Sequence, residues 1–398
     1  MSDEAYKFVE VAAVLKAGRR VAHLMREPTG VVFAYEPNYD GPAVATTLPV
    51  GGAPVRHAGG ALPPFFAGLL PEGRRLTAIR QAVKTSADDE LSLLLVVGGD
   101  LVGDVSVLPD GDSSPFPATE VAGSLDDIVF RELFERAVGP SIADRAGLAG
   151  VQDKVSGRMI ALPVAYDDAA WILKLDPPEY PGLVANEAFF LAAARRSGLR
   201  TADASIVRDK EGHAGLLVRR FDRFAVAGEL RRLAQEDACQ VLGRYPADKY
   251  RMTTEEVIAG LAARTGAPVV AARSLLQQFA FAYLTCNGDA HGKNFSVLHN
   301  GTEWQVAPAY DLPSTQPYRD DTMALAIGGK QREDIGRAEF VALGNGCGVP
   351  EKAVARVLDE LIAAAPVWLG DLDALPFDER RIHKLRKACS YRLARLRG

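Results

Sequence analysis

The sequence predicts an α+β protein with a small β-rich N-terminal domain, followed by a two-lobed unit whose second lobe is mostly helical. Three observations support this prediction. Residues 8 to about 50 alternate apolar and polar positions in short runs that Gly and Pro interrupt, as in short strands. Residues 158–221 contain further strand-like segments and a helix, and the last third has apolar residues at helical spacing. We therefore expect a domain over 1–110, a first lobe over 125–225 and a second lobe over 226–398.

The composition is that of an ordinary globular protein without extreme charge. The chain has 398 residues, enough for two domains, with 48% hydrophobic and 24% charged residues. A net charge of −5 indicates no strong general attraction to nucleic acid or anionic membranes. Four cysteines lie far apart without a CxxC pair, so we expect neither a zinc site nor disulfides, and reduced thiols suit a cytoplasmic protein. The N-terminus lacks a signal-peptide pattern, and the apolar stretches are too short for a membrane span of ~20 residues.

The N-terminal domain is expected to combine strands with helices. Residues 31–35 form a short apolar run typical of a strand. The segment 62–73 introduces helical patterns that continue to about residue 95, and 98–108 indicates a glycine-rich turn followed by a closing strand. Residues 110–117 are rich in Asp, Ser, Gly and Pro, which predicts a linker before the second unit.

The second unit begins with strands and becomes helical. Strands are predicted over 158–163, 171–175, 205–208 and 215–221. One helix is predicted over 184–196, with Gly198 as its stop, and a buried helix over 271–286. A C-terminal helix over 377–397 has one apolar face, formed by Ile382, Leu385, Cys389, Leu393 and Leu396. A sheet lobe followed by a helical lobe is the order of a two-lobed protein kinase, although many other α+β folds share it.

The segment 287–294 carries residues suited to phosphoryl transfer, a reaction that needs an acid beside the attacking hydroxyl, oxygen ligands for Mg²⁺ and cations near the phosphates. Asp289 follows the buried helix and could accept a hydroxyl proton. Asn294 lies five residues later, the interval between the catalytic Asp and the metal-binding Asn of protein kinases. Lys293 could neutralise charge on the moving phosphoryl group, and His291 could orient the loop. The alternative is an Asx-rich turn that merely ends the buried helix.

Two further positions extend this pattern. Asp311 follows Asn294 after an expected hairpin over 295–306, where a kinase places its second metal-binding aspartate. Lys174 is the lone cation in an apolar strand and therefore needs a partner. Glu187, thirteen residues on in the next helix, is the candidate, because kinases hold the α- and β-phosphates with such a Lys–Glu pair. Taken singly, Lys174 and Glu187 would more often be solvated surface residues, and Asp311 would be a common kind of turn aspartate.

Weaker signals lie elsewhere in the second unit. The small residues of 147–154 would let backbone N–H groups approach phosphates, but the loop lacks a GKS/T ending, and an ordinary turn is the default interpretation. Residues 219–223 end a strand where adenine would meet the hinge between the lobes, or they form a charged strand end. The eight basic residues of the C-terminal helix favour a solvated face over phosphate contacts.

Taken together, these motifs resemble the HipA family, the kinase toxins of bacterial type II toxin–antitoxin modules. The matching segments cover nearly the whole chain: 33–35, 69–73, 149–154, 172–175, 186–187, 220–223, 235–240, 288–296 and 308–311. The resemblance implies a protein-kinase-like fold and an ATP- and Mg²⁺-dependent serine/threonine protein kinase. It implies a cytosolic protein substrate, in the founding case an aminoacyl-tRNA synthetase, whose phosphorylation blocks translation and arrests growth. It also implies a small helix-turn-helix antitoxin (HipB-like) as partner, with DNA bound mainly through that antitoxin and no membrane.

By this analogy Asp289 is the base, with His291 and Lys293 beside it, and Asn294 and Asp311 hold Mg²⁺. Residues 149–154 form the phosphate loop, and 219–221 form the hinge. The implied ATP-binding set is Ala149, Gly150, Val151, Gln152, Asp153, Lys154, Lys174, Glu187, Arg219, Arg220, Phe221, His291, Lys293, Asn294, Tyr310 and Asp311.

The chain departs from the family pattern in two places. Well-known members carry a serine before the phosphate loop, whose autophosphorylation silences the kinase. Gly147 and Leu148 stand there in this chain, and neither Ser141 nor Ser156 matches that serine. Arg219 stands where close relatives have a hinge glutamate.

Two other functions remain open from the residues. The 288–294 pattern also resembles small-molecule phosphotransferases such as aminoglycoside and choline kinases, although these have no comparable N-terminal domain. The other possible function is that of an inactive, kinase-like corepressor. The presence of all four residues Lys174, Asp289, Asn294 and Asp311 argues against it.

Overall fold

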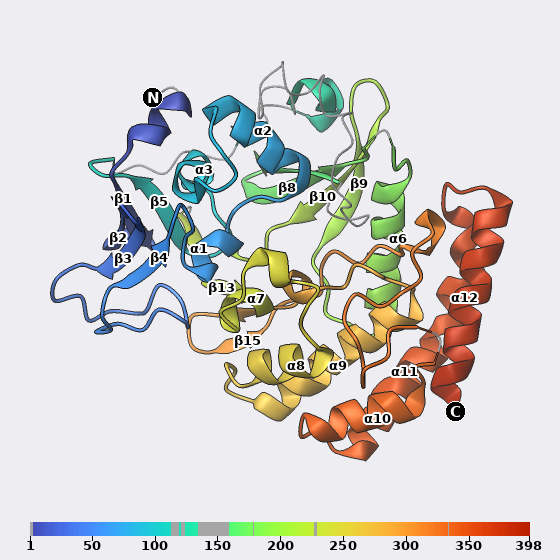
Figure 1. The fold of residues 1–398 in the computed structure, drawn as a ribbon. Helices are drawn as coiled ribbons and strands as arrows, with labels where there is room; N and C mark the ends of the chain where they lie inside the picture. Colours follow the sequence, from blue (N-terminus) through green and yellow to red (C-terminus); the bar gives the residue numbers. More distant parts are fainter. Residues whose placement is uncertain are drawn as a thin grey trace.

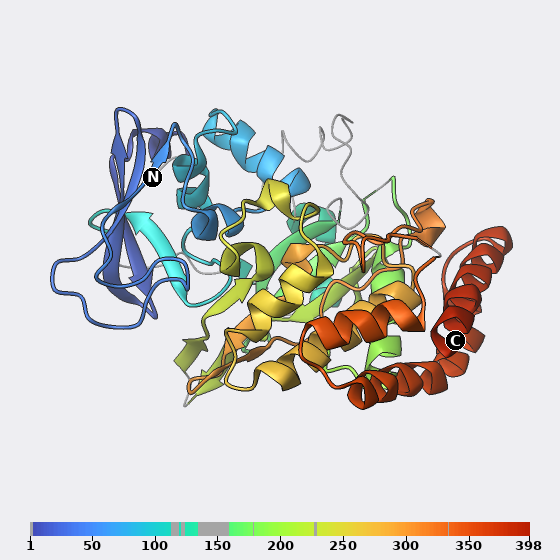
Figure 2. The same cartoon turned by 60° about the horizontal axis from the view of Figure 1, so that its bottom comes forward.

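The computed structural model describes residues 3–112, 119–120, 124–133, 159–177, 179–226, 229–332 and 334–398. The N-terminal sheet lies at one end of the molecule, the C-terminal helices lie at the other, and a second sheet lies between them (Figure 1; Figure 2). The order of sheet and helix along the chain is therefore the one expected from the sequence.

The N-terminal domain is built around an antiparallel sheet with the order β4-β3-β2-β1-β5. Its strands are β1 (Val11–Lys16), β2 (Arg19–Glu27), β3 (Gly30–Tyr35), β4 (Val55–Ala58) and β5 (Val105–Pro109). Three helices accompany it, namely α1 (Pro64–Gly68), α2 (Gly73–Val83) and α3 (Glu90–Val97). Apolar side chains of the strands and of α1 and α3, such as Leu24, Phe33, Phe66 and Leu94, share one core, which removes apolar surface from water. This core holds the α1–α2 loop in a fixed place beside the second unit.

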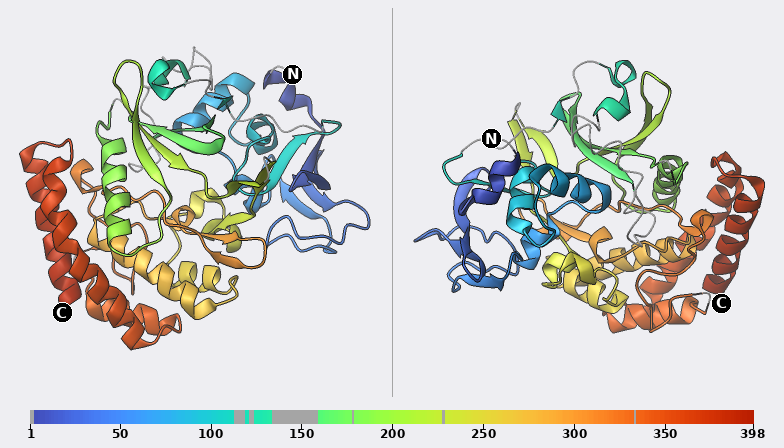
Figure 3. Two further views of the ribbon diagram at one scale, coloured as in Figure 1. Left: turned by 180° about the vertical axis from the view of Figure 1, so that it is seen from behind. Right: turned by 45° about the horizontal axis from the view of Figure 1, so that its top comes forward.

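The second unit opens with another sheet, in the order β6-β7-β8-β10-β9. Its strands are β6 (Thr119–Glu120), β7 (Ile160–Tyr166), β8 (Ala169–Leu175), β9 (Ala204–Arg208) and β10 (Ala214–Arg219). Helix α6 (Leu183–Arg196) packs on β9 and β10, and Figure 3 shows it alongside this sheet. Gly198 ends the helix with φ 82, a left-handed conformation that glycine adopts without steric cost. The four strands and the helix predicted for this lobe are present, with their ends shifted by a few residues.

The second lobe is mostly helical, as expected. Its helices are α7 (Ala238–Val241), α8 (Thr254–Ala262), α9 (Pro268–Leu284), α10 (Arg337–Gly346), α11 (Glu351–Gly370) and α12 (Glu379–Arg397). Helix α9 is its centre, because almost every side chain from Ala271 to Leu284 is buried. The expected hairpin is present as β14 (Ser296–His299) and β15 (Trp304–Val306). Three further short strands were not predicted, namely β11 (Arg223–Val226), β12 (Glu229–Arg232) and β13 (Gln235–Asp237), the last of which pairs with β14.

Helix α12 confirms its predicted apolar face and corrects one detail. Ile382, Leu385, Cys389, Leu393 and Leu396 are all buried. The basic residues on its other side are mainly solvated, but Arg392 is buried. The Nη1 of Arg392 donates to the main-chain carbonyl of Tyr283 at 2.6 Å, and its guanidinium lies 4.9 Å from the centre of the Tyr283 ring. The four cysteines have free thiols. Among the described residues, none of the helices combines the length and apolar character that a membrane span requires.

Candidate active site

The candidate catalytic loop begins where the buried helix α9 ends. Cys286, two residues beyond the helix, has φ 55, which turns the chain out of the helix direction. Oδ1 of Asn287 accepts the N–H of Asp289 at 3.0 Å, and Oδ1 of Asn294 accepts the N–H of His291 at 3.0 Å. Such bonds from Asn side chains to nearby backbone hold a loop in one conformation. The Asx-rich turn that the sequence allowed is therefore present, and it is made by the amides of Asn287 and Asn294.

Lys174 of β8 lies in a buried charge cluster. Its Nζ contacts Oε1 and Oε2 of Glu187, on α6, at 2.7 and 2.9 Å, and Oδ1 of Asp311 at 3.2 Å. Nδ2 of Asn294 donates to Oδ2 of Asp311 at 2.6 Å. The ion pair expected between strand and helix is thus present, and it extends to two residues expected only from their order along the chain.

Burial and charge oppose each other in this cluster. Burial alone would lower the pKa of Lys174, but Asp311 and Glu187 outweigh it and raise the pKa above the ordinary value. Burial raises the pKa of Glu187 to about 6, even against the attraction of Lys174. Burial alone would raise the pKa of Asp311, but the charge of Lys174 and the hydrogen bonds from Lys174 and Asn294 contribute to lowering it below the ordinary value. At neutral pH the cluster therefore presents a cation and an ionised aspartate to the cavity beside it.

Asp289 is only 2% exposed and lies beside an aromatic pair. The hydroxyl of Tyr250 donates to its Oδ1 at 2.6 Å. The ring of His291 lies edge-on to Tyr250, with 5.0 Å between ring centres, and its Nδ1 is buried without a hydrogen-bond partner among the described residues. Burial, reinforced by Lys249, lowers the pKa of His291 to about 3, so the ring is neutral at physiological pH. Nothing in the sequence pointed to Tyr250.

Lys293 points toward the N-terminal domain. Its Nζ donates to the carbonyl of Gly68 at 3.0 Å and contacts Oε1 of Glu72 at 2.9 Å. Oε2 of Glu72 pairs with Nζ of Lys249. The sequence singled out 69–73 by its family resemblance alone, without a role for Glu72. Tyr310 supports the same loop, because its hydroxyl donates to the carbonyl of Lys293 at 2.7 Å.

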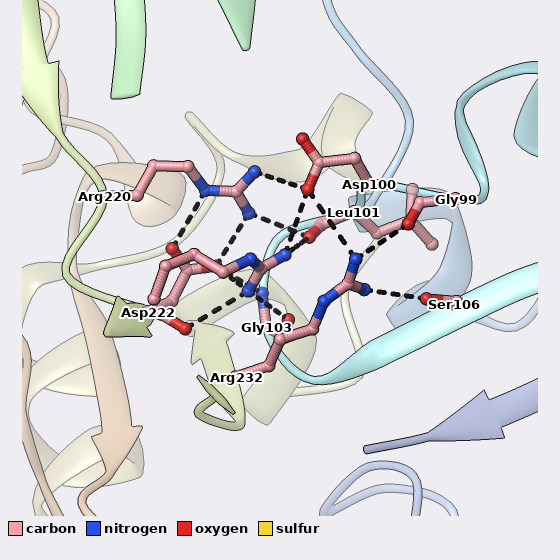
Figure 4. A network of polar contacts seen from close by, with 9 residues as sticks. Gly99, Asp100, Leu101, Gly103, Ser106, Arg220, Asp222 and Arg232 are labelled. Atoms are coloured by element: carbon pink, nitrogen blue, oxygen red, sulfur yellow. Dashed lines mark hydrogen bonds and ion pairs between the residues drawn. The ribbon is translucent and has the colours of Figure 1, made fainter. Parts of the chain in front are cut away.

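The expected hinge, 219–221, has a more specific structure than expected. The guanidinium of Arg220 is buried and bonds Asp222 at 2.8 and 3.0 Å and Asp100 of the N-terminal domain at 2.8 Å (Figure 4). The main-chain N–H groups of Arg219 and Arg220 donate to the carbonyls of Asp203 and Ala170. These three donor groups are therefore engaged within the protein and not directed to an adenine ring.

Phe221, the third hinge residue, lies beside Tyr310, with 5.7 Å between ring centres. Both rings line a cavity of about 390 Å³ between the sheet lobe, the catalytic loop and the N-terminal domain. The apolar side chains of Ile172 and Val218 form part of its wall, and Lys174 and Asp311 are among its polar lining residues. This combination of an apolar wall and a few convergent polar groups is typical of a small-molecule site. The expected phosphate loop, 149–154, lies outside the described residues.

Asn294 and Asp311 have the chemistry that Mg²⁺ requires. Both side chains line the cavity, and they touch each other through the 2.6 Å hydrogen bond. Carboxylate and amide oxygens are hard ligands, and an amide oxygen has a second lone pair besides the one that the N–H of His291 uses. The donor set therefore fits this ion.

Comparison with known proteins places the chain in a family. Residues 12–108 match the model of the HipA N-terminal domain, and residues 146–369 match that of the HipA-like C-terminal domain. A putative kinase of Sinorhizobium fredii is 33% identical over 344 residues, which are 80% of this chain and 82% of the relative. The serine/threonine-protein kinase toxin HipA of Shewanella oneidensis is 29% identical over 347 residues, 78% of each chain.

A solved structure supports the same assignment at the level of the fold. The toxin of the Shewanella oneidensis complex of HipA, HipB and operator DNA superposes with a TM-score of 0.76, at 23% identity, over 96% of both chains. The predicted two-lobed, kinase-like α+β fold is thereby confirmed. With both family domains matched in order, the chain belongs to the HipA family.

Proposed function

We propose that this protein is the toxin of a type II toxin–antitoxin module and acts as an ATP- and Mg²⁺-dependent serine/threonine protein kinase. The observation that carries the proposal is the convergence of Lys174, Asp289, Asn294 and Asp311, with Glu187 behind Lys174, from separate elements at one cavity and its loop. All five side chains are polar, and three of them, Glu187, Asp289 and Asn294, are buried, which is costly without a purpose or a partner.

Each residue has a role that its contacts suit. Lys174, held by Glu187, binds the α- and β-phosphates of ATP. Asn294 and Asp311 hold Mg²⁺, whose charge offsets that of the phosphate oxygens. Asp289, fixed by the hydroxyl of Tyr250, accepts the proton of the Ser or Thr hydroxyl. The oxygen of that hydroxyl forms a bond to the γ-phosphorus as the bond to the β–γ bridging oxygen breaks, and ADP leaves.

The partners follow from the relatives. The Shewanella oneidensis HipA was solved with HipB and operator DNA, which supports a HipB-like helix-turn-helix antitoxin as the partner of this chain and DNA contact mainly through it. A cytosolic protein is the proposed substrate, by family analogy an aminoacyl-tRNA synthetase, and the proposed location is the cytoplasm. Phosphorylation of that substrate would block translation and arrest growth.

Brief induction of the protein in a bacterial host, followed by identification of new phosphoproteins, tests this proposal. The parent should arrest growth and label a protein, and Asp289→Asn should do neither, because the amide cannot take up the hydroxyl proton. Asp112→Asn, at an exposed turn, is the matched control and should behave as the parent. Growth arrest by Asp289→Asn equal to that of the parent would show that the kinase mechanism is wrong. Label found only on small molecules in a lysate with labelled ATP would favour a small-molecule phosphotransferase instead.

A further inference from the structure

The α1–α2 loop of the N-terminal domain places a carboxylate against the candidate catalytic loop. Oε1 of Glu72 lies 2.9 Å from Nζ of Lys293, and Oε2 pairs with Nζ of Lys249. Lys293 also donates to the carbonyl of Gly68, at the end of α1. Both lysine side chains are about 15% exposed, so their partners are the protein's own groups more than water. We call this arrangement, made by Glu72, Lys249 and Lys293, the Glu72 clamp.

The two lysines of the clamp belong to the two chain segments that carry and contact the candidate base. Lys293 belongs to the same loop as Asp289, four residues away. Lys249 precedes Tyr250, whose hydroxyl donates to Oδ1 of Asp289 at 2.6 Å. The two segments are also joined directly, because the N–H of Gly292 donates to the carbonyl of Lys249 at 3.0 Å. A movement of Glu72 would therefore displace both the loop that carries Asp289 and the Tyr250 hydroxyl that donates to Asp289.

The charges make this contact stable. Burial alone would raise the pKa of Glu72, but Lys293 and Lys249 outweigh it and hold the pKa well below its ordinary value. One carboxylate thus lies between two ammonium groups that would otherwise repel each other, and removing it leaves two poorly hydrated cations side by side.

We propose that Glu72 is a positioning residue for phosphoryl transfer, through which the N-terminal domain holds Lys293 and the Tyr250 segment in place around Asp289. This inference rests on the proposed kinase function and adds to it that the N-terminal domain completes the catalytic arrangement. Within the part of the chain that the structure describes, the ion pairs and hydrogen bonds of Glu72 do not involve Lys174, the proposed nucleotide contact, or the candidate metal ligands. Its loss should therefore slow the reaction at saturating ATP more than it weakens ATP binding.

The test measures the rate at which labelled ATP phosphorylates the protein band that the parent labels in lysate, at a fixed lysate concentration and varied ATP. For Glu72→Gln we expect the maximal rate to fall about 10- to 100-fold, with the KM for ATP within about threefold of the parent value. Glu72→Asp keeps the charge on a shorter side chain and should recover part of the rate. Glu4→Gln, which breaks an exposed pair with Lys84 in the same domain, is the matched control and should match the parent.

Lys249→Met removes one cation of the clamp, and it tests the same inference if Glu72→Gln is too unstable to assay. It should also lower the maximal rate, and the double variant should lose less than the product of the two single losses, because all three residues act as one unit. The circular dichroism melting curve of each variant sets an assay temperature at which it is folded. The inference would be overturned if either variant, Glu72→Gln or Lys249→Met, is folded and reacts at the parent rate. It would also be overturned if the KM for ATP rises while the maximal rate is unchanged. Both outcomes leave the kinase proposal intact. A parent that transfers no label to protein would overturn both.

Discussion

Replacing Asp222 with Ala should destabilise the protein more than the loss of any surface charge, because two buried arginines depend on it. Oδ2 of Asp222 accepts from Arg220, Arg223 and the N–H of Gly103, each at 2.8 Å, and Oδ1 accepts from Arg220 at 3.0 Å (Figure 4). Asp222 is 3% exposed. Removing one partner of a buried ion pair costs about 3–5 kcal/mol, since the remaining charge stays desolvated. We expect the free energy of unfolding to fall by about that amount.

Two further Ala variants set the scale. Asp100 contacts the same arginines from the N-terminal domain, at 2.8 and 3.3 Å, but it is partly exposed. Its replacement should cost about 1.5–3 kcal/mol, the range for a hydrogen bond to a charged group. Asp110 forms an exposed pair with Arg20 in the same domain, and its replacement should cost at most about 1 kcal/mol. The predicted order of destabilisation is therefore Asp222, then Asp100, then Asp110.

Urea denaturation followed by two probes measures these losses. The three tryptophans, Trp171, Trp304 and Trp368, all lie in the second unit, so their fluorescence reports on that unit, whereas far-ultraviolet circular dichroism reports on the whole chain. In the Asp100 and Asp222 variants the two transitions should separate, because the network that joins the domains is weakened. A midpoint for Asp222→Ala no lower than that for Asp110→Ala would refute the reasoning.

The same carboxylate predicts part of the acid denaturation. Burial alone would raise the pKa of Asp222, but Arg220 and Arg223 outweigh it and lower the pKa to about 2. A lowered folded-state pKa means that the stabilisation is complete above the unfolded value of 3.8 and is lost as pH falls toward 2. Parent stability should therefore fall over this interval, and the Asp222→Ala variant should show a shallower decline in the free energy of unfolding measured at each pH.

Three shorter predictions concern the site. Lys174→Met should abolish phosphorylation in the lysate assay. It should also lower the free energy of unfolding by about 3 kcal/mol, because Glu187 is left buried without its cation. An unchanged melting temperature would contradict the expected loss of stability. Asp311→Asn should raise the Mg²⁺ concentration for half-maximal phosphorylation at least about tenfold, and a parent-like Mg²⁺ titration would argue against a ligand role. Burial raises the pKa of Asp237 to about 6, so the folded protein should lose stability as pH rises from about 4 to about 6. Asp237→Asn keeps a side chain that can cap α7 and should remove this pH dependence. Denaturation curves at pH 4 and 7 measure the difference in the free energy of unfolding, which should be at most about 3 kcal/mol for the parent.

The sequence predicted those parts of the structure that depend on local pattern. The strand of Lys174, the helix of Glu187 and the loop from Asp289 to Asn294 follow from periodicity and short spacings, and the structure has all three. Strand β13 could not be predicted this way, because it has only three residues and pairs with β14, about sixty residues later. Arg392 shows the same limit, since its position on a basic helix face indicated solvent, whereas its hydrogen bond to Tyr283 depends on how α9 and α12 pack.

The contacts between the domains explain why the site could be predicted only in part. Glu72 and Asp100 belong to a chain with 51 acidic residues, and no local pattern shows that one of them pairs with Lys293 and the other with Arg220. Both contacts reach the second unit at places that the proposed kinase function requires to be rigid, the candidate catalytic loop and the expected hinge. The buried guanidinium of Arg220 takes two of its partners, Asp100 and the carbonyl of Leu101, from the N-terminal domain, and a second unit without that domain would lose both contacts. The N-terminal domain is therefore part of the structural support of the candidate active site, which gives a physical reason for both family domains to occur in one chain.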